Sequence, residues 1–229
     1  MKMLRTRTRL AALALISLGA LSGCGGLHPG LAAVVGDSTI SNNDVDSLGR
    51  DLCTVVTSSP EQQTTAFPRS TALEAVVQRF VMRSIADQMG EEYDVSASST
   101  YDADVDAAKQ QFSYVDPEVL DRVLDLLVAD RYFNDVLTSI GKEALVAEGA
   151  SQPTAEDQLA KGVQLAQVWE TTHDVAINPR FPSLSLGDTS FTQTPDQTSV
   201  AVSDFARQAA KTPPDAEWIA GLPAAQRCG

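Results

Sequence analysis

Few side chains in this sequence stand at spacings that support catalysis. The two histidines are His28 and His173, and the one acid beside either of them is Asp174. A histidine at a helix end more often contacts the last carbonyl groups than a substrate. No serine lies in a G-x-S-x-G turn, and the folded part of the chain offers no second histidine for a triad. We therefore predict no catalytic residue and no enzymatic activity.

Metal and cofactor sites have no better support. Asp102, Asp104 and Asp106 lack the glycine and the closing glutamate of a twelve-residue calcium loop. No glycine-rich phosphate cradle occurs. The remaining possible ligands are too scattered for any zinc-ligand spacing: His28, Cys53, His173 and Cys228. We expect neither a metal nor a cofactor.

The start of the chain has the layout of an export signal. A leader with four basic residues precedes an apolar run from Leu10 to Leu21, and Ser22-Gly23-Cys24 follows. As a helix the run would be about 18 Å long, well short of the roughly 30 Å of bilayer hydrocarbon. A signal that is removed is therefore favoured over a membrane span.

The segment Leu21-Ser22-Gly23-Cys24 resembles the lipobox of bacterial lipoproteins. This resemblance implies that residues 1–23 are a lipoprotein signal peptide and that Cys24 is lipidated. Residues 24–31 would then be a short tether, and the protein would lie on the extracytoplasmic face of the cell membrane, anchored through its lipid. A plain secretory signal that happens to contain a cysteine is the alternative.

Cys53 and Cys228 are the cysteines that remain if Cys24 carries lipid. Outside the cytoplasm, two leftover thiols are more often paired than free. A bond between them would close the loop of residues 54–227 and stabilise the fold by roughly 5 kcal/mol on the chain-entropy model. We predict this disulfide, which makes the C-terminus part of the fold.

The charge balance limits the possible partners. The chain carries 17 basic and 30 acidic residues, and loss of the leader with its four basic residues changes the net charge from −13 to −17. Such a surface repels nucleic acid and does not suit anionic headgroups. We therefore expect no nucleic-acid partner, whereas basic or neutral polypeptide is tolerated.

Hydrophobic periodicity predicts a mainly α-helical fold. Helices are expected at about 41–56, 68–89 and 98–112, from Pro117 to Gly141, and from Pro153 to His173, with Gly90 as a C-terminal cap. Residues 32–41 predict a strand, a tight turn at Gly36-Asp37 and a return strand, and residues 175–181 a further short strand. Together these make a small β element that joins the N-terminal strand to the segment after the last long helix.

Part of this pattern resembles a known family. Ala32-Ala33-Val34-Val35-Gly36-Asp37, then Ile40-Ser41 and a helix opened by Asn43-Asp44-Val45-Asp46, is similar to the N-terminal signature of SurA/PrsA-type chaperones. Asn178-Pro179-Arg180-Phe181 resembles the return strand of lipoprotein members. The resemblance covers residues 32–181. It implies a single SurA N-terminal-like helical domain at 32–229, with a tail (182–229) packed back on it.

The chain also departs from that family. Full members carry a parvulin isomerase domain with paired histidines, whereas residues 180–229 contain no histidine and only Cys228 as a cysteine. The resemblance therefore implies a holdase that binds unfolded or nascent exported polypeptides without isomerase activity. Two alternatives stay open, an envelope adaptor that binds one specific protein and a divergent prolyl isomerase.

The lipid anchor is directly testable. Mass spectrometry of the membrane-extracted protein should find an N-terminal peptide that begins at Cys24 and carries acyl chains. An unmodified Cys24 would contradict the lipobox interpretation.

Overall fold

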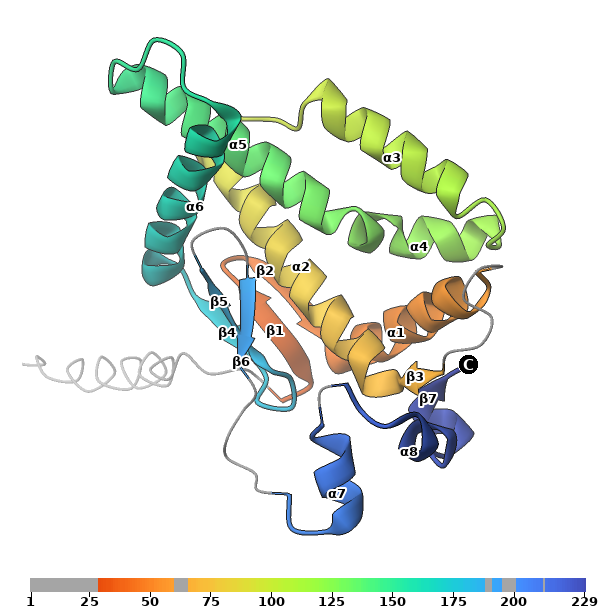
Figure 1. Ribbon diagram of the computed structural model, residues 1–229. Coiled ribbons are helices and arrows are strands. Elements are labelled where there is room, and N and C mark those ends of the chain that lie inside the picture. The colour runs from red at the N-terminus through yellow and green to blue at the C-terminus, as the bar shows by residue number, and fades with distance from the viewer. Residues whose placement is uncertain (1–28, 60–65, 188–190, 195–200, 212) are drawn as a thin grey trace, which may run out of the picture.

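The computed structural model describes residues 29–59, 66–187, 191–194, 201–211 and 213–229 (Figure 1). The signal segment 1–23, the lipidation candidate Cys24 and most of the tether 24–31, His28 included, therefore lie outside the described residues.

The prediction of a mainly α-helical fold is confirmed. Six longer helices form the body, and two short helices and a 3-10 turn follow near the C-terminus (Figure 1). The described helices are α1 (Asn42–Thr57), α2 (Arg69–Glu92), α3 (Ser99–Gln111), α4 (Pro117–Leu127), α5 (Ala129–Ala147), α6 (Ala155–Thr172), α7 (Asp204–Ala209), α8 (Ala216–Ala220) and the 3-10 helix η1 (Ala224–Gln226).

The expected β element is present as an antiparallel sheet in the order β2-β1-β4. The strands are β1 (Leu31–Val35), β2 (Ser38–Ser41) and β4 (Val175–Ile177). Val35 pairs with Ser38 on one side and with Val175 on the other. The turn at Gly36 has a φ of +51°, which glycine adopts at little cost. The sheet thus brings the segment after α6 back to the start of the folded chain.

Side-chain caps set several helix starts. Ser41 Oγ accepts a hydrogen bond from the Asp44 amide at 3.1 Å, and the Asp44 carboxylate accepts one from the Ser41 amide at 3.3 Å. Thr154 and Asp157 repeat this capping box at the start of α6. Such reciprocal caps satisfy amides that the helix leaves free.

Two expected helix ends are wrong. α2 continues past Gly90 to Glu92, and α5 continues past Gly141 to Ala147. The residue with positive φ after α2 is Asp94, at 54°. Moreover, the helix expected from Pro117 to Gly141 is divided at Val128 into α4 and α5. These glycines serve close packing, since a Cβ at Gly90 would lie 2.9 Å from the Val95 carbonyl oxygen.

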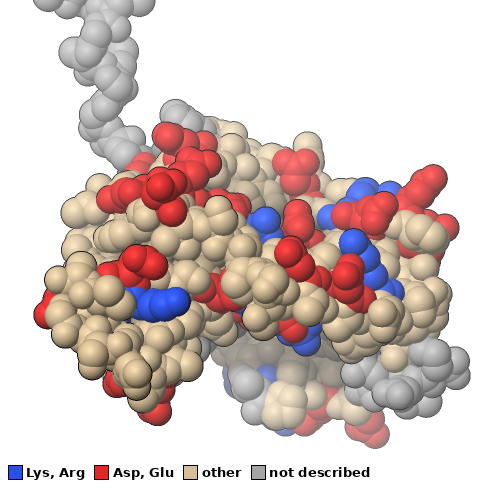
Figure 2. Space-filling model, turned by 90° about the horizontal axis from the view of Figure 1, so that it is seen from above, with Lys and Arg blue, Asp and Glu red and all other residues tan. Residues whose placement is uncertain are grey.

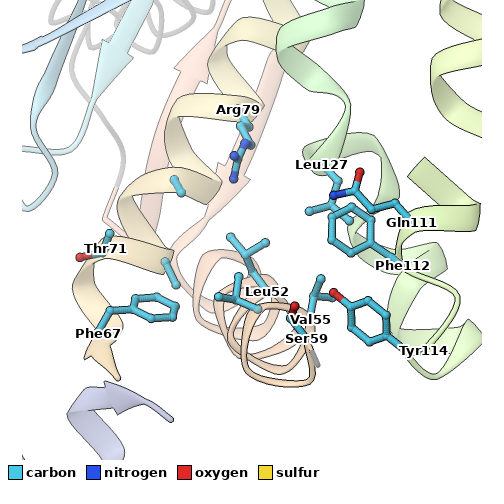
Figure 3. A pocket seen from close by; sticks show the side chains of 13 residues that line it. Leu52, Val55, Ser59, Phe67, Thr71, Arg79, Gln111, Phe112, Tyr114 and Leu127 are labelled. Carbon is cyan, nitrogen blue, oxygen red and sulfur yellow. The ribbon is translucent and has the colours of Figure 1, made fainter. Parts of the chain in front are cut away.

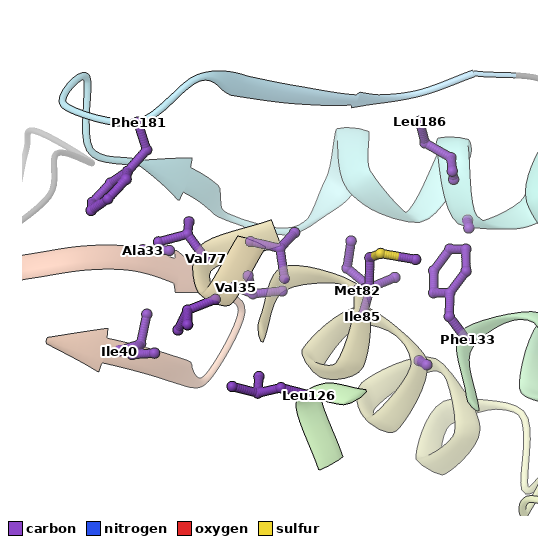
Figure 4. Close-up of a cluster of buried hydrophobic side chains, with 14 of the residues drawn as sticks. Ala33, Val35, Ile40, Val77, Met82, Ile85, Leu126, Phe133, Phe181 and Leu186 are labelled. Atoms are coloured by element: carbon purple, nitrogen blue, oxygen red, sulfur yellow. The ribbon is translucent and has the colours of Figure 1, made fainter. Parts of the chain in front are cut away.

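The core surrounds α2, which lies between the sheet and the helices α5 and α6 (Figures 1 and 4). Val35 from the sheet, Ile85 from α2 and Phe133 from α5 are almost fully buried in it. Gln88 of α2 donates to the Val35 carbonyl at 2.7 Å and accepts from the Asp37 amide at 3.3 Å. The hairpin is therefore fixed to α2 by both apolar and polar contacts.

The C-terminal residues return to the start of α2. β7 (Arg227–Cys228) pairs with β3 (Phe67–Pro68), and Cys228 is joined by a disulfide to Cys53 of α1, with Cα atoms 5.2 Å apart. Earlier in the tail, the hairpin β5 (Ser183–Leu186) and β6 (Phe191–Thr194) follows β4, and Gln167 of α6 donates to the Leu186 carbonyl at 3.2 Å.

The backbones of α5 and α6 are in direct contact at two glycines, each of which faces the backbone of the other helix. A Cβ at Gly141 would lie 1.8 Å from the Gln158 carbonyl oxygen, and a Cβ at Gly162 would lie 2.0 Å from that of Leu137. Real Cβ atoms cannot approach backbone atoms so closely, so the two helices must separate to accept any larger residue.

We predict that Gly162→Ala lowers the free energy of unfolding by about 2 kcal/mol, although alanine is the better helix former. Urea denaturation should show a lower midpoint. Gly221→Ala is the matched control, because its Cβ would meet no atom closer than 3.5 Å. Equal stability of Gly162→Ala and the unsubstituted protein would contradict the close contact.

Candidate functional site

A groove with apolar walls lies between α1, α2, β3 and the turn that joins α3 to α4 (Figure 3). Its volume is about 490 Å³, which falls in the range of ligand-sized hollows, roughly 300–1,000 Å³. We call it the apolar groove. Thirteen residues line it: Leu52, Val55, Val56, Ser59, Phe67, Thr71, Ala72, Ala75, Arg79, Gln111, Phe112, Tyr114 and Leu127.

Helical periodicity explains two walls of the apolar groove. Leu52, Val55 and Val56 are three and four residues apart on α1 and therefore share a face. On α2 the facing positions include Ala72 and Ala75, whose small side chains do not fill the space opposite. Ala72 is nearly fully buried, whereas Ala75 is half-buried, and a leucine at position 75 would extend further into the hollow.

The remaining walls come from irregular segments. Phe112 caps the C-terminal end of α3, and Tyr114 follows it in the turn, with the two ring centroids 6.2 Å apart in an edge-to-face arrangement. The Tyr114 side chain is exposed, whereas Phe112 is half-buried. Phe67 belongs to β3, whose pairing with β7 and nearness to the Cys53–Cys228 disulfide fix one edge of the apolar groove.

A polar cluster fixes the helices that carry these walls. Arg83 of α2 donates to the Tyr101 hydroxyl of α3 at 2.9 Å and forms ion pairs with Asp87 at 3.3 Å and Asp125 of α4 at 3.8 Å. Its guanidinium also lies 3.6 Å from the ring centroid of Tyr132 on α5. One cation on α2 thereby contacts three neighbouring helices.

The same cluster shifts the acidity of a tyrosine. The Tyr132 hydroxyl donates to Asp87 at 2.6 Å. Burial, together with this hydrogen bond, raises the pKa of Tyr132 well above its ordinary value. The phenol therefore stays protonated and remains a donor to Asp87 at physiological pH.

Arg79 is the charged residue among the thirteen that line the apolar groove. It lies one helical turn before Arg83, is half-buried, and extends toward the hollow in Figure 3. Within the described part of the chain it makes neither a hydrogen bond nor an ion pair. The groove therefore combines apolar walls with one cationic group.

The histidine and the aspartates considered in the sequence analysis do not line the apolar groove. The ring of His173 stacks on Trp169, with centroids 3.9 Å apart, and its Nδ1 lies 3.0 Å from the Trp169 carbonyl oxygen, the helix-end contact that the sequence favours. Asp104 forms an ion pair with Arg131, and Asp106 with Lys109, each at 3.9 Å. Among the described residues, no group of three or more His, Cys, Asp or Glu side chains is arranged to hold a metal ion.

Sequence reasoning missed the residues that define the apolar groove. Ala72, Ala75 and Arg79 lie on one helical stripe, and small residues in such a stripe could have suggested a gap. The sequence does not show, however, that Phe67 and Phe112, 45 positions apart, face the same stripe.

Comparisons with protein-family models, with curated proteins and with solved structures found no match to this chain. Of the helices in the described ranges, none combines the length and the apolar character that a bilayer span requires.

The apolar groove predicts an asymmetry between two alanines of α2. Ala75→Leu should leave the free energy of unfolding within about 0.5 kcal/mol, because the new side chain enters the hollow. Ala86→Leu should lower it by about 2 kcal/mol, because Ala86 is fully buried in the core. Urea denaturation of both variants measures the difference, and equal losses would show that position 75 faces a filled space.

Proposed function

We propose that the chain is a membrane-anchored extracytoplasmic holdase that binds unfolded exported polypeptides in the apolar groove. The single observation that carries this proposal is the composition of the groove. Eight of the thirteen lining residues are aliphatic or phenylalanine, and Tyr114 adds a further ring. A hollow of this kind accepts the apolar side chains that an unfolded chain exposes and a folded protein buries.

The size of the groove sets how it can bind. At about 490 Å³ it holds a few side chains of an extended segment and no folded domain. Full burial of one leucine or phenylalanine side chain contributes about 1.5–3 kcal/mol, and association and ordering oppose this gain. Binding by two or three such side chains is therefore weak and reversible. Release then needs no ATP, metal or cofactor.

The surface supports the same role. The net charge of the chain is −13, and acidic side chains outnumber basic ones on the face seen in Figure 2. A surface with a large net negative charge discourages association between copies whose apolar grooves are open. It also disfavours nucleic acid as a partner.

The order of elements and the anchor fit the proposal. A β hairpin, a group of helices and a strand that returns to the hairpin form the arrangement that the SurA/PrsA-type resemblance implies. If Cys24 carries lipid, six residues lie between it and Leu31 at the start of β1. Fully extended, a tether of this length spans about 25 Å, which would keep the start of the folded domain near the membrane at which exported chains emerge.

The proposal predicts that the full chain in phosphatidylcholine nanodiscs suppresses the aggregation of several unrelated unfolded proteins, measured by light scattering. Ala75→Glu places a carboxylate in the apolar groove one turn before Arg79 and should weaken this suppression about fivefold, since the new side chain fills the hollow and its ion pair with Arg79 puts a polar group where apolar occupants would lie. Ala107→Glu, on the exposed face of α3, is the matched control and should act like the unsubstituted protein. Thermal melts of both variants verify that they are folded.

The same experiment separates the holdase from an adaptor. An adaptor would leave the aggregation of every unrelated client unchanged and would co-purify with one protein. Failure to protect any client would overturn the proposed function.

A further inference from the structure

The three arginines of α2 have different partners. Arg69 forms an ion pair with Asp46 of α1 at 3.5 Å, and Arg83 forms ion pairs with Asp87 and Asp125. Arg79 has no counterpart of this kind among the described residues, although the chain carries 30 acidic residues. Packing thus provides carboxylates for two of the three cations and leaves the one in the apolar groove available.

The surroundings of Arg79 make an acidic ligand favourable. A guanidinium that is partly removed from water gains more from a carboxylate than an exposed one, because water competes less for it. Its planar donors also match the two oxygens of a carboxylate. The other polar groups of the groove, on Ser59, Thr71, Gln111 and Tyr114, are uncharged.

We propose that the apolar groove selects extended internal segments in which an aspartate or glutamate lies among apolar residues, with the acidic side chain bound by Arg79. This inference rests on the proposed function and adds a preference among clients. Apolar side chains of the segment would lie against Val56, Phe67 and Phe112, which are half-buried walls of the groove, and the carboxylate would bind the guanidinium of Arg79.

The net charge sharpens this selectivity. An acidic segment without apolar residues is repelled by a chain whose net charge is −17 after loss of the leader, and it gains nothing from the walls. An apolar segment without an acid leaves the half-buried guanidinium unpaired. A segment that has both apolar residues and an acid therefore binds most tightly. A segment with lysine in place of the acid binds most weakly, because its ammonium group would lie beside the guanidinium of Arg79.

The test uses three labelled heptapeptides with blocked ends, Ser-Val-Phe-Glu-Leu-Val-Ser and its analogues with Gln or Lys at the fourth position. Fluorescence anisotropy with the full chain in phosphatidylcholine nanodiscs measures each Kd, and empty nanodiscs provide the blank. The unsubstituted protein should bind the Glu peptide about fivefold more tightly than the Gln peptide, and the Lys peptide more weakly than either. Added salt should reduce the preference.

Two arginine variants give the decisive comparison. Arg79→Gln should bind the Glu and Gln peptides equally, because the group that distinguishes them is removed. Arg50→Gln removes an exposed arginine of α1 that does not line the apolar groove and should retain the preference.

Each failure has its own meaning. Equal Kd values for the Glu and Gln peptides in the unsubstituted protein, or a preference that survives in Arg79→Gln, would overturn the role of Arg79 while the holdase stands. Absence of binding by all three peptides would overturn the proposed function as well. A fatty acid can be added as a competitor of the labelled Glu peptide. If it displaced that peptide more effectively than unlabelled Glu peptide does, and did so only in the protein that retains Arg79, the occupant would be a lipid carboxylate. The assignment to a peptide would then be wrong.

Discussion

The contact between the backbones of α5 and α6 is the constraint on which much of this fold depends. Gly141 and Gly162 allow carbonyl groups of the opposite helix to occupy the space of a side chain. The two helices therefore pack closely side by side. The strand that follows α6 then lies next to β1, at the start of the folded chain. Only from that position can Val175 of β4 pair with Val35 of β1 and close the sheet over α2. A wider separation of the helices would move β4 away from its partner.

The two ends of α2 are used differently. Its C-terminal half is packed against the sheet, α5 and α6 and is filled by large side chains such as Ile85 and Met89. Its N-terminal half carries Ala72 and Ala75 and faces α1 across the apolar groove. One helix thus provides the centre of the core and one wall of a binding hollow, because the size of its side chains changes along its length.

Cross-links at the rim keep that hollow from collapsing. The disulfide between Cys53 and Cys228 joins α1 to β7, and β7 pairs with the strand that carries Phe67. On the other side, Arg83 connects α2 to α3, α4 and α5 through its contacts with Tyr101, Asp125 and Tyr132. An apolar hollow at a surface normally shrinks when its walls are free to move. Here the walls are fixed from outside by a covalent bond and by the contacts of a half-buried cation, Arg83.

The sequence by itself determined the helical class, the hairpin and the return strand, because these depend on local periodicity and turn residues. The pairing of Cys53 with Cys228 was predicted from the sequence only on the premise that the third cysteine, Cys24, carries lipid. The sequence also identified the cap at Ser41 and Asp44, since a capping box is complete within four residues. It misassigned Gly90 and Gly141 as helix ends, because a glycine that ends a helix and one that admits a neighbouring backbone look alike in a sequence.

Only the tertiary structure decided which backbone atoms lie against Gly90 and Gly141, and which alanines of α2 line the apolar groove. It also decided which of the three arginines on α2 lacks a carboxylate within the described residues. The apolar groove is bounded by segments as distant in the chain as Leu52 and Leu127. Its shape therefore depends on contacts between segments remote in sequence, which local preferences do not specify.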